Sequence, residues 1–267
     1  MARGFTLMEM VMAIILLGIV GLFLGNVAGQ AMGIAATSSS REALIQQGRF
    51  ITERLSRELR EAVPNSVIVN NDNTCIEFLP IVNSALYSEL PVEDGPFRLL
   101  LINKQLTEGQ RLVVFPRSAV ELLGYPLDAV EEQEQEQEQE QWARIEPQNF
   151  ELDETNALTM IDVVISAENG FSLHSPARRV YIYDNPVAFC YQNGRIYRYA
   201  NYGFEREGLP PSAFSNGVLM AENLSQASFE AAKPQLQRNG LIKIELTFED
   251  RGEKVEFVHN ALIYNAP

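Results

Sequence analysis

The chain has 267 residues, of which 46% are hydrophobic. This fraction is typical of a protein with a packed core and excludes a chain that is disordered over its whole length. Its 21 basic and 35 acidic side chains give a formal net charge of -14, which disfavours binding to nucleic-acid phosphates. The two histidines are isolated and no phosphate-binding or nucleophile motif occurs, so we predict no enzyme activity, no cofactor and no metal site.

The first element along the chain is an apolar run from Phe5 to Gly25, long enough to cross a bilayer as a helix. Arg3 precedes the run, and a positive charge on that side holds the start of the chain in the cytoplasm and sends the remainder outward. A cleaved secretory signal is the simpler interpretation. Such a signal ends at a small-residue cleavage site, whereas this run continues without a clear break into an amphipathic pattern.

Glu9 is an ionisable side chain inside the apolar run. An uncompensated carboxylate in hydrocarbon costs about 2.5–3.5 kcal/mol on insertion scales, so a residue in this position is a functional candidate. The alternative is that Glu9 lies at the level of the lipid headgroups, near the start of the helix.

Residues 3–11, with the sequence Arg-Gly-Phe-Thr-Leu-Met-Glu-Met-Val, resemble the processing motif of type IV prepilins and type II secretion pseudopilins. The resemblance implies that a prepilin peptidase removes a leader, residues 1–4, by cutting after Gly4, and then methylates the new N-terminus at Phe5. It also implies that Glu9 pairs with the Phe5 ammonium of a neighbouring subunit and fixes the assembly register. Such pairing avoids leaving two buried charges uncompensated.

Helical patterning continues to Val63, where Pro64 is expected to end it. We assign residues 5–26 to a transmembrane and assembly half and residues 27–63 to an amphipathic half. Five glycines indicate close helix packing or, as the resemblance implies, local melting on joining a filament: Gly18, Gly21, Gly25, Gly29 and Gly33. Apolar residues three and four apart predict a stripe that packs on the protein's own sheet: Leu44, Gly48, Ile51, Leu55, Leu59 and Ala62.

Residues 64–267 are expected to form one globular domain of strands and turns. Asn193-Gly194, between two aromatic and β-branched runs, predicts a hairpin with a type I′ turn. Apolar alternation over residues 242–248 predicts a strand with one buried face, joined through residues 249–254 to a second strand. Shorter strands are expected at residues 67–69, 75–79 and 98–102. These elements predict an α+β fold, a long helix packed on a mostly antiparallel sheet, as in pilins.

Residues 131–141 alternate Glu and Gln without any apolar side chain. Such a tract buries no surface, so we expect a disordered or fraying helical insertion. An acidic tract that binds a partner is the alternative.

Segments further along the chain, at 178–187, 219–224 and 259–267, are similar to minor pilins of the mannose-sensitive haemagglutinin (MSHA) pilus system, which are related to the J-type minor pseudopilins. The resemblance implies a non-catalytic subunit of the inner membrane with its C-terminal domain in the periplasm. It would initiate, assemble or cap a pilus. The implied partners are the prepilin peptidase, other minor and major pilins, the inner-membrane assembly platform and the lipid bilayer.

Two alternatives remain beside the minor pilin. One is a minor pseudopilin of a type II secretion system, which would have the same membrane helix and the same charge pairing but would serve a secretion machine instead of a pilus. A pilus-associated adhesin would use the aromatic strand Tyr197-Arg198-Tyr199, or Tyr202, to bind a ligand, although aromatics at alternating positions more often pack within a sheet.

Cys75 and Cys190 are the two cysteines and allow one intramolecular pairing. Because the resemblance places the globular domain in the oxidising periplasm, a disulfide is feasible, and its closure of a long loop corresponds to about 4 kcal/mol of stability. Two separate buried thiols are the other possibility.

Overall fold

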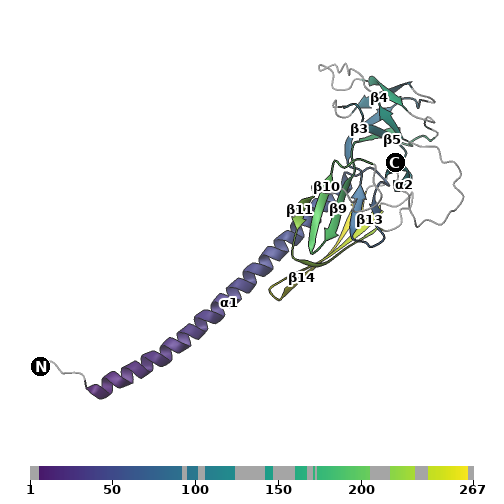
Figure 1. The fold of residues 1–267 in the computed structure, drawn as a ribbon. Helices are drawn as coiled ribbons and strands as arrows, with labels where there is room; N and C mark the ends of the chain where they lie inside the picture. The colour runs from purple at the N-terminus through teal and green to yellow at the C-terminus, as the bar shows by residue number, and fades with distance from the viewer. Residues whose placement is uncertain are drawn as a thin grey trace.

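The computed structural model describes residues 6–91, 95–101, 106–123, 142–146, 160–166, 171, 173–204, 217–231 and 240–263. Over these ranges the chain forms one long helix, one short helix and fourteen strands (Figure 1). The helices are α1 (Leu7–Arg60) and α2 (Ala119–Leu123). The strands are β1 (Ile68–Val69), β2 (Cys75–Phe78), β3 (Ile81–Tyr87), β4 (Gly95–Leu101), β5 (Arg111–Val114), β6 (Trp142–Ile145), β7 (Met160–Ser166), β8 (Arg179–Tyr183), β9 (Val187–Gln192), β10 (Arg195–Ala200), β11 (Val218–Ala221), β12 (Leu224–Ala231), β13 (Gly240–Asp250) and β14 (Glu253–Ile263). Gly4, Phe5 and the Glu/Gln tract at 131–141 lie outside the described residues.

The end of α1 lies at Arg60, three residues before the predicted end at Val63. The reason is a competing set of backbone hydrogen bonds. Val63 N–H donates to the Leu79 carbonyl at 2.8 Å, and the Glu61 carbonyl accepts from Ile81 N–H at 2.8 Å. The chain thus leaves the helix to pair with the segment that leads into β3.

Two antiparallel sheets pack against the C-terminal part of α1, one with the order β1-β2-β9-β10-β11 and one with the order β12-β13-β14. They meet where Phe229 N–H donates to the Asn73 carbonyl at 2.8 Å. All six residues of the predicted apolar stripe are buried: Leu44, Gly48, Ile51, Leu55, Leu59 and Ala62. This confirms the α+β fold with a long helix on antiparallel sheet. We name this part, comprising α1 from Ser40 together with both sheets, the helix–sheet lobe.

Both predicted hairpins are present. Asn193 and Gly194 have φ angles of 50° and 77°, as a type I′ turn requires. The second hairpin is tighter than predicted. Arg251 and Gly252 form its two-residue turn, with φ angles of 50° and 83°, and β13 and β14 pair up to that turn. The six-residue connection expected at 249–254 was therefore wrong, because a glycine at positive φ closes the hairpin within two residues.

A closed barrel with the order β3-β4-β7-β6-β5-β8 is inserted between β2 and β9. Figure 1 shows it at the end of the molecule far from the N-terminus. It has its own hydrophobic core, made of Ala85, Tyr87, Phe97, Leu99, Leu101, Leu112, Val114, Ala143, Ile145, Val163, Ile165, Phe171, Val180 and Ile182. No barrel was predicted from the sequence within residues 64–267.

A third apolar cluster joins the barrel to the helix–sheet lobe. It includes Val63 and Leu79, which follow α1 and β2, and Tyr183 from β8. Beside it the Arg111 guanidinium lies over two rings, 4.6 Å from the Trp142 centroid and 3.6 Å from the Phe204 centroid. The contact with Phe204 adds to the apolar packing between the barrel and the segment that follows β10.

Candidate functional site

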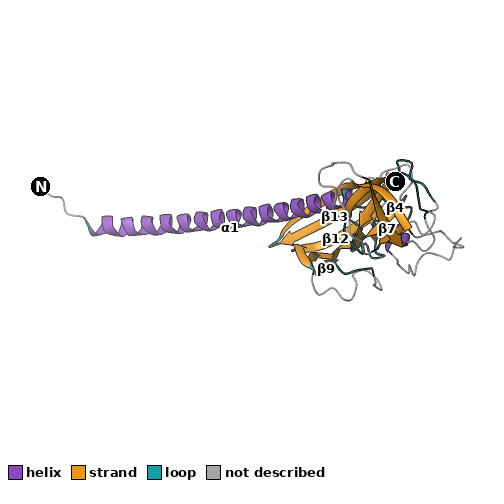
Figure 2. Cartoon of the chain, turned by 90° about the horizontal axis from the view of Figure 1, so that it is seen from above, coloured by secondary structure: helices purple, strands orange, loops and turns teal. Residues whose placement is uncertain are grey.

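The N-terminal part of α1 packs against nothing in the described chain. Every side chain from Leu7 to Ser39 is exposed, and the most apolar 18-residue window has a mean hydropathy of 2.6 with none of it buried. Figures 1 and 2 show this part extending away from all strands. We name Leu7–Ser39 the exposed half and Ser40–Arg60 the packed half of α1. By length and composition, the exposed half is able to cross a membrane.

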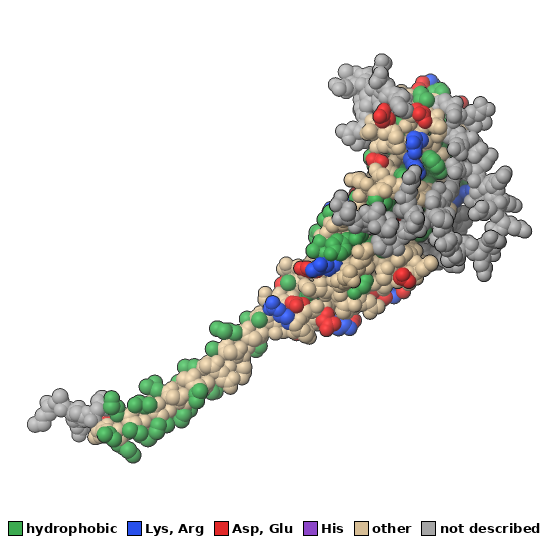
Figure 3. All heavy atoms as spheres, in the orientation of Figure 1, with side chains coloured by type: hydrophobic (Ala, Val, Ile, Leu, Met, Phe, Trp, Pro, Cys, Tyr) green, Lys and Arg blue, Asp and Glu red, His purple; other side chains and the backbone are tan. Residues whose placement is uncertain are grey.

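Hydrophobic side chains line the exposed half on the face drawn in Figure 3, and charged side chains lie over the helix–sheet lobe and the barrel. The large ones are Leu7, Met8, Met10, Val11, Met12, Ile14, Ile15, Leu16, Leu17, Ile19, Val20, Leu22, Phe23, Leu24, Val27, Met32 and Ile34. Soluble monomers rarely expose contiguous apolar patches of more than a few hundred Å². The exposed half is therefore a larger contiguous apolar surface than soluble monomers usually show.

Glu9 lies at the third position of α1 and forms a capping box with Thr6. Its carboxylate accepts from the Thr6 N–H and the Thr6 hydroxyl, both at 3.2 Å, while Glu9 N–H donates to Thr6 Oγ1 at 3.3 Å. The negative charge thus lies at the positive end of the helix dipole. The Thr-x-x-Glu spacing of a capping box was visible in the sequence, but this role was not among those predicted for Glu9.

Of the predicted processing residues, Gly4 and Phe5 are outside the described residues, so the structure shows no geometry for them. The described chain begins at Thr6, the residue that follows Phe5. Because Thr6 N–H donates to Glu9, the carboxylate lies beside the backbone of that next residue. Cleavage after Gly4 would place a new ammonium one residue away from this hydrogen bond.

The predicted disulfide between Cys75 and Cys190 is present. The two cysteines are directly opposite on β2 and β9, with their Cα atoms 4.1 Å apart, and both are buried. β2 is the last strand before the barrel and β9 the first after it. The disulfide therefore links the two strands between which the barrel is inserted.

The aromatic residues that were candidates for ligand binding lie beside this disulfide. Tyr199 is buried against Cys75 and Cys190, and Tyr197 and Tyr202 are half-buried around them. Burial raises the pKa of Tyr199 above its ordinary value, and the charge of Tyr197 adds to the effect. The Tyr202 hydroxyl donates to Glu77, a buried carboxylate on β2. No sequence pattern marked Glu77, because its burial depends on the pairing of distant strands.

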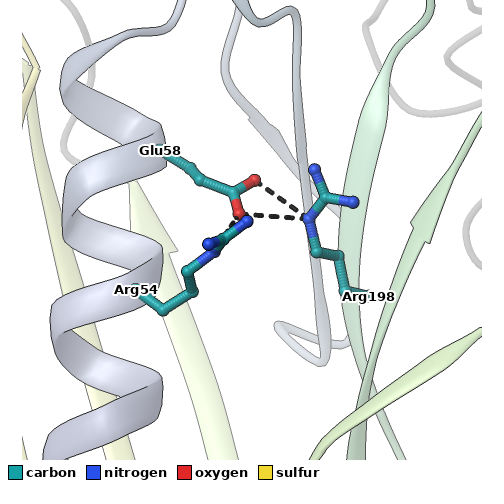
Figure 4. A network of polar contacts seen from close by, with 3 residues as sticks. All are labelled: Arg54, Glu58 and Arg198. Carbon is teal, nitrogen blue, oxygen red and sulfur yellow. Dashed lines mark hydrogen bonds and ion pairs between the residues drawn. The ribbon is translucent and has the colours of Figure 1, made fainter.

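The packed half of α1 is attached to β10 by a charged network (Figure 4). Arg198 Nε lies 3.0 and 3.1 Å from the two Glu58 oxygens, and Arg54 Nε lies 2.6 Å from Glu58 Oε1. The Glu58 side chain is only 13% exposed. Glu58 lies outside the predicted apolar stripe, and it is covered because Arg198 of β10, a strand distant in the sequence, contacts it.

No protein-family model, curated protein or solved structure matches the chain. Over the described residues, no three His, Cys, Asp or Glu side chains are grouped so that they could hold a metal ion. Function is therefore inferred from α1, its cap and the N-terminal motif.

Proposed function

We propose that this chain is a non-catalytic minor pilin of an MSHA-type type IV pilus, with the exposed half of α1 in the inner membrane and the remainder in the periplasm. It would join other minor and major pilins to initiate, assemble or cap the filament. The observation that carries the proposal is one continuous helix whose first half is exposed and apolar and whose second half is packed on the protein's own sheets.

The exposed half needs apolar surroundings. Burying one Leu, Ile, Phe or Met side chain gains about 1.5–3 kcal/mol, and this half exposes many of them. A bilayer and a bundle of like helices both supply such surroundings. A subunit that moves from one to the other keeps this gain, which supports a role in filament assembly.

Glycines on the exposed half favour close packing of like helices. A Cβ atom built at Gly18, Gly21, Gly25, Gly29 or Gly33 meets nothing within 4 Å. These positions therefore serve no packing within the described chain, and on a membrane helix such small residues let a neighbouring backbone approach. α1 is continuous through all five glycines, so any local melting would belong to the assembled state.

In this proposal Glu9 exchanges partners during assembly. In the isolated chain its carboxylate lies at the N-terminus of its own helix, where a negative charge contributes about 0.3–1 kcal/mol. In apolar surroundings an unpaired ammonium on a neighbouring Phe5 costs several kcal/mol, which a carboxylate partly offsets. This cost exceeds the contribution of the cap, so the loss of the cap is offset when Glu9 moves to that ammonium. Glu9 would thus fix the register, as the resemblance implies.

Mass spectrometry of the mature N-terminus tests the proposal. After expression with a prepilin peptidase, we expect the mature chain to begin at methylated Phe5. An N-terminus elsewhere, such as one near residue 36, would overturn the pilin assignment and indicate a secreted domain.

Glu9→Gln and Thr6→Val separate the two roles of the carboxylate. Glu9→Gln keeps an acceptor for the Thr6 N–H and removes the charge, whereas Thr6→Val removes the capping hydroxyl and keeps the charge. We expect Glu9→Gln to remain membrane-bound and correctly processed but to be lost from sheared pili, and Thr6→Val to be incorporated. Equal incorporation of Glu9→Gln and wild type would exclude pairing between subunits. The mature N-terminus of Thr6→Val serves as its processing control.

A pseudopilin would use the same membrane helix and the same Glu9 pairing. The proteins that co-purify with the chain distinguish the two, because they would come either from a pilus or from a secretion machine. For the adhesin alternative, Tyr199 is buried beside the disulfide, so only the half-buried Tyr197 and Tyr202 of the named tyrosines present surface to a ligand.

A further inference from the structure

A polar pocket of about 640 Å³ lies in the helix–sheet lobe where the exposed half of α1 leaves it. Three connections line it: the β9–β10 turn, the β11–β12 link and the β13–β14 turn. Leu224 N–H donates to the Gly194 carbonyl at 3.0 Å, and Glu249 N–H donates to the Asn223 carbonyl at 2.8 Å. These bonds hold the three connections together.

The packed half of α1 begins beside this pocket. The Ser40 hydroxyl donates to Asp250 Oδ2 at 2.6 Å, and Glu222 N–H donates to Gln47 Oε1 at 3.1 Å. In Figure 1 the hairpin of β13 and β14 points along α1 towards its N-terminal end. The pocket therefore lies on the side of the lobe that faces the membrane if the exposed half spans it.

The length of the uncharged helix sets the height of the pocket above the bilayer. Between Glu9 and Arg41 no residue is ionisable. At 1.5 Å per residue, residues 10–40 are roughly 46 Å long. A bilayer is roughly 40–45 Å thick with its headgroups and about 30 Å without them. The uncharged stretch thus matches the whole bilayer, and Asp250, bonded to Ser40, comes to the level of the outer headgroups.

The pocket carries charges of both signs. Two guanidinium groups, Arg195 and Arg251, are 52% and 75% exposed. Each has a loose ion-pair partner: Arg195 Nε lies 3.8 Å from Glu222 Oε2, and Arg251 Nε lies 3.9 Å from Asp250 Oδ2. Both guanidinium groups therefore keep donors for a phosphate, which arginine binds through two parallel hydrogen bonds.

The carboxylates decide which phosphate compound fits. Glu222, Glu249 and Asp250 outnumber the two arginines in the lining, so a simple anion is repelled. A zwitterion with a phosphate and a primary ammonium satisfies both signs, because the ammonium donates up to three hydrogen bonds to carboxylates. A quaternary ammonium has no N–H to donate.

We infer that this pocket binds the headgroup of a phosphatidylethanolamine in the outer leaflet of the membrane that holds α1, with the phosphate at Arg195 and Arg251 and the ammonium at the carboxylates. This rests on the proposed membrane anchoring. Headgroup binding sets the height and tilt of the lobe on the bilayer, and it must be broken when the subunit is extracted.

The test is an isothermal calorimetric titration of the full chain in a phosphate-free maltoside detergent. The titrant is dihexanoylphosphatidylethanolamine, kept below its micelle concentration. We expect saturable binding of one lipid per chain. The double variant R195Q/R251Q should bind at least five-fold more weakly, and R60Q, which removes an arginine of α1 outside the lining, should bind as wild type does. Thermal unfolding of each variant checks that the fold is unchanged.

Two ligand controls complete the experiment. Dihexanoylphosphatidylcholine should bind at least five-fold more weakly, and inorganic phosphate at millimolar concentration should not compete. Equal binding of wild type and R195Q/R251Q, or competition by phosphate alone, would overturn the headgroup assignment. Because the titration is done in detergent, its failure leaves the anchoring intact. A mature N-terminus elsewhere than at Phe5 would instead remove the proposed function, whatever the titration shows.

Discussion

The two halves of α1 belong to one unbroken helix but depend on different surroundings. The packed half buries a stripe of side chains against two sheets, whereas the exposed half buries none. Isolated helices are marginal in water, and most helical stability in proteins comes from packing. The packed half therefore owes its stability to the protein's own sheets, while the exposed half needs lipid or a neighbouring helix. Substitutions in the packed half should change the free energy of unfolding of the lobe, and substitutions in the exposed half should not.

The largest contrast is expected between Leu55→Ala and Leu17→Ala. Leu55 is fully buried in the packed half, and Leu17 is 71% exposed in the other half. We expect Leu55→Ala to lower the free energy of unfolding by about 2–5 kcal/mol, because it loses burial and leaves a cavity. Leu17→Ala should change it by less than about 0.5 kcal/mol. Guanidinium unfolding of the full chain in detergent, followed by near-UV circular dichroism, measures both. A comparable loss in Leu17→Ala would mean that the exposed half packs on the lobe.

A charge substitution makes a smaller contrast within the packed half. Glu58→Gln removes the carboxylate shared by Arg54 and Arg198, whereas Glu53→Gln changes an exposed side chain. Hydrogen bonds to charged groups contribute about 1.5–3 kcal/mol, and the amide keeps part of the bonding, so we expect a loss of about 1–2 kcal/mol for Glu58→Gln. Glu53→Gln serves as the matched control and should unfold as wild type does. Indistinguishable midpoints for the two variants would show that the network does not attach α1 to β10.

Glycine substitutions also distinguish the two halves of α1. A Cβ atom at Gly48 would overlap the Phe257 ring, whereas one at Gly21 meets nothing within 4 Å. Overpacking costs about 1–3 kcal/mol, and alanine gains about 1 kcal/mol of helix propensity over glycine. We expect Gly48→Ala to destabilise the lobe by up to about 2 kcal/mol and Gly21→Ala to leave its unfolding unchanged. The same denaturation experiment measures both, and a stabilised Gly48→Ala would show that Phe257 moves aside freely.

Features that depend on local order were predictable from the sequence. The stripe on α1 repeats at helical spacing, and Asn193-Gly194 marks its turn by composition alone. Features that depend on distant pairing were not. The barrel closes through β3–β8 and β5–β8 pairs, whose partners lie far apart along the chain, and no local pattern encodes that closure. The low exposure of Glu58 was not predictable either, because its partner, Arg198, comes from such a distant strand.

The residues of the candidate site also divide into those that local sequence indicates and those that depend on distant pairing. Glu9 was found because a charge within an apolar run is visible in sequence, but its cap was overlooked although the Thr6–Glu9 spacing was equally visible. The pairing of Cys75 with Cys190 remained open because it requires the register of β2 against β9, across a separation of 115 residues. The headgroup pocket could not be predicted, since three separate connections build it.

The smallest expected effect locates the boundary between the two halves. Ser39 is exposed, whereas the hydroxyl of Ser40 donates to Asp250 at 2.6 Å. We expect Ser40→Ala to lower the free energy of unfolding by about 0.5–1.5 kcal/mol, because the bond joins α1 to the β13–β14 turn, and Ser39→Ala to have no measurable effect. Hydrogen exchange of the same variants should show faster exchange at residues 249–252 in Ser40→Ala alone. If both variants unfold and exchange like wild type, the lobe does not hold α1 at this point, and the packed half begins further along, at Leu44.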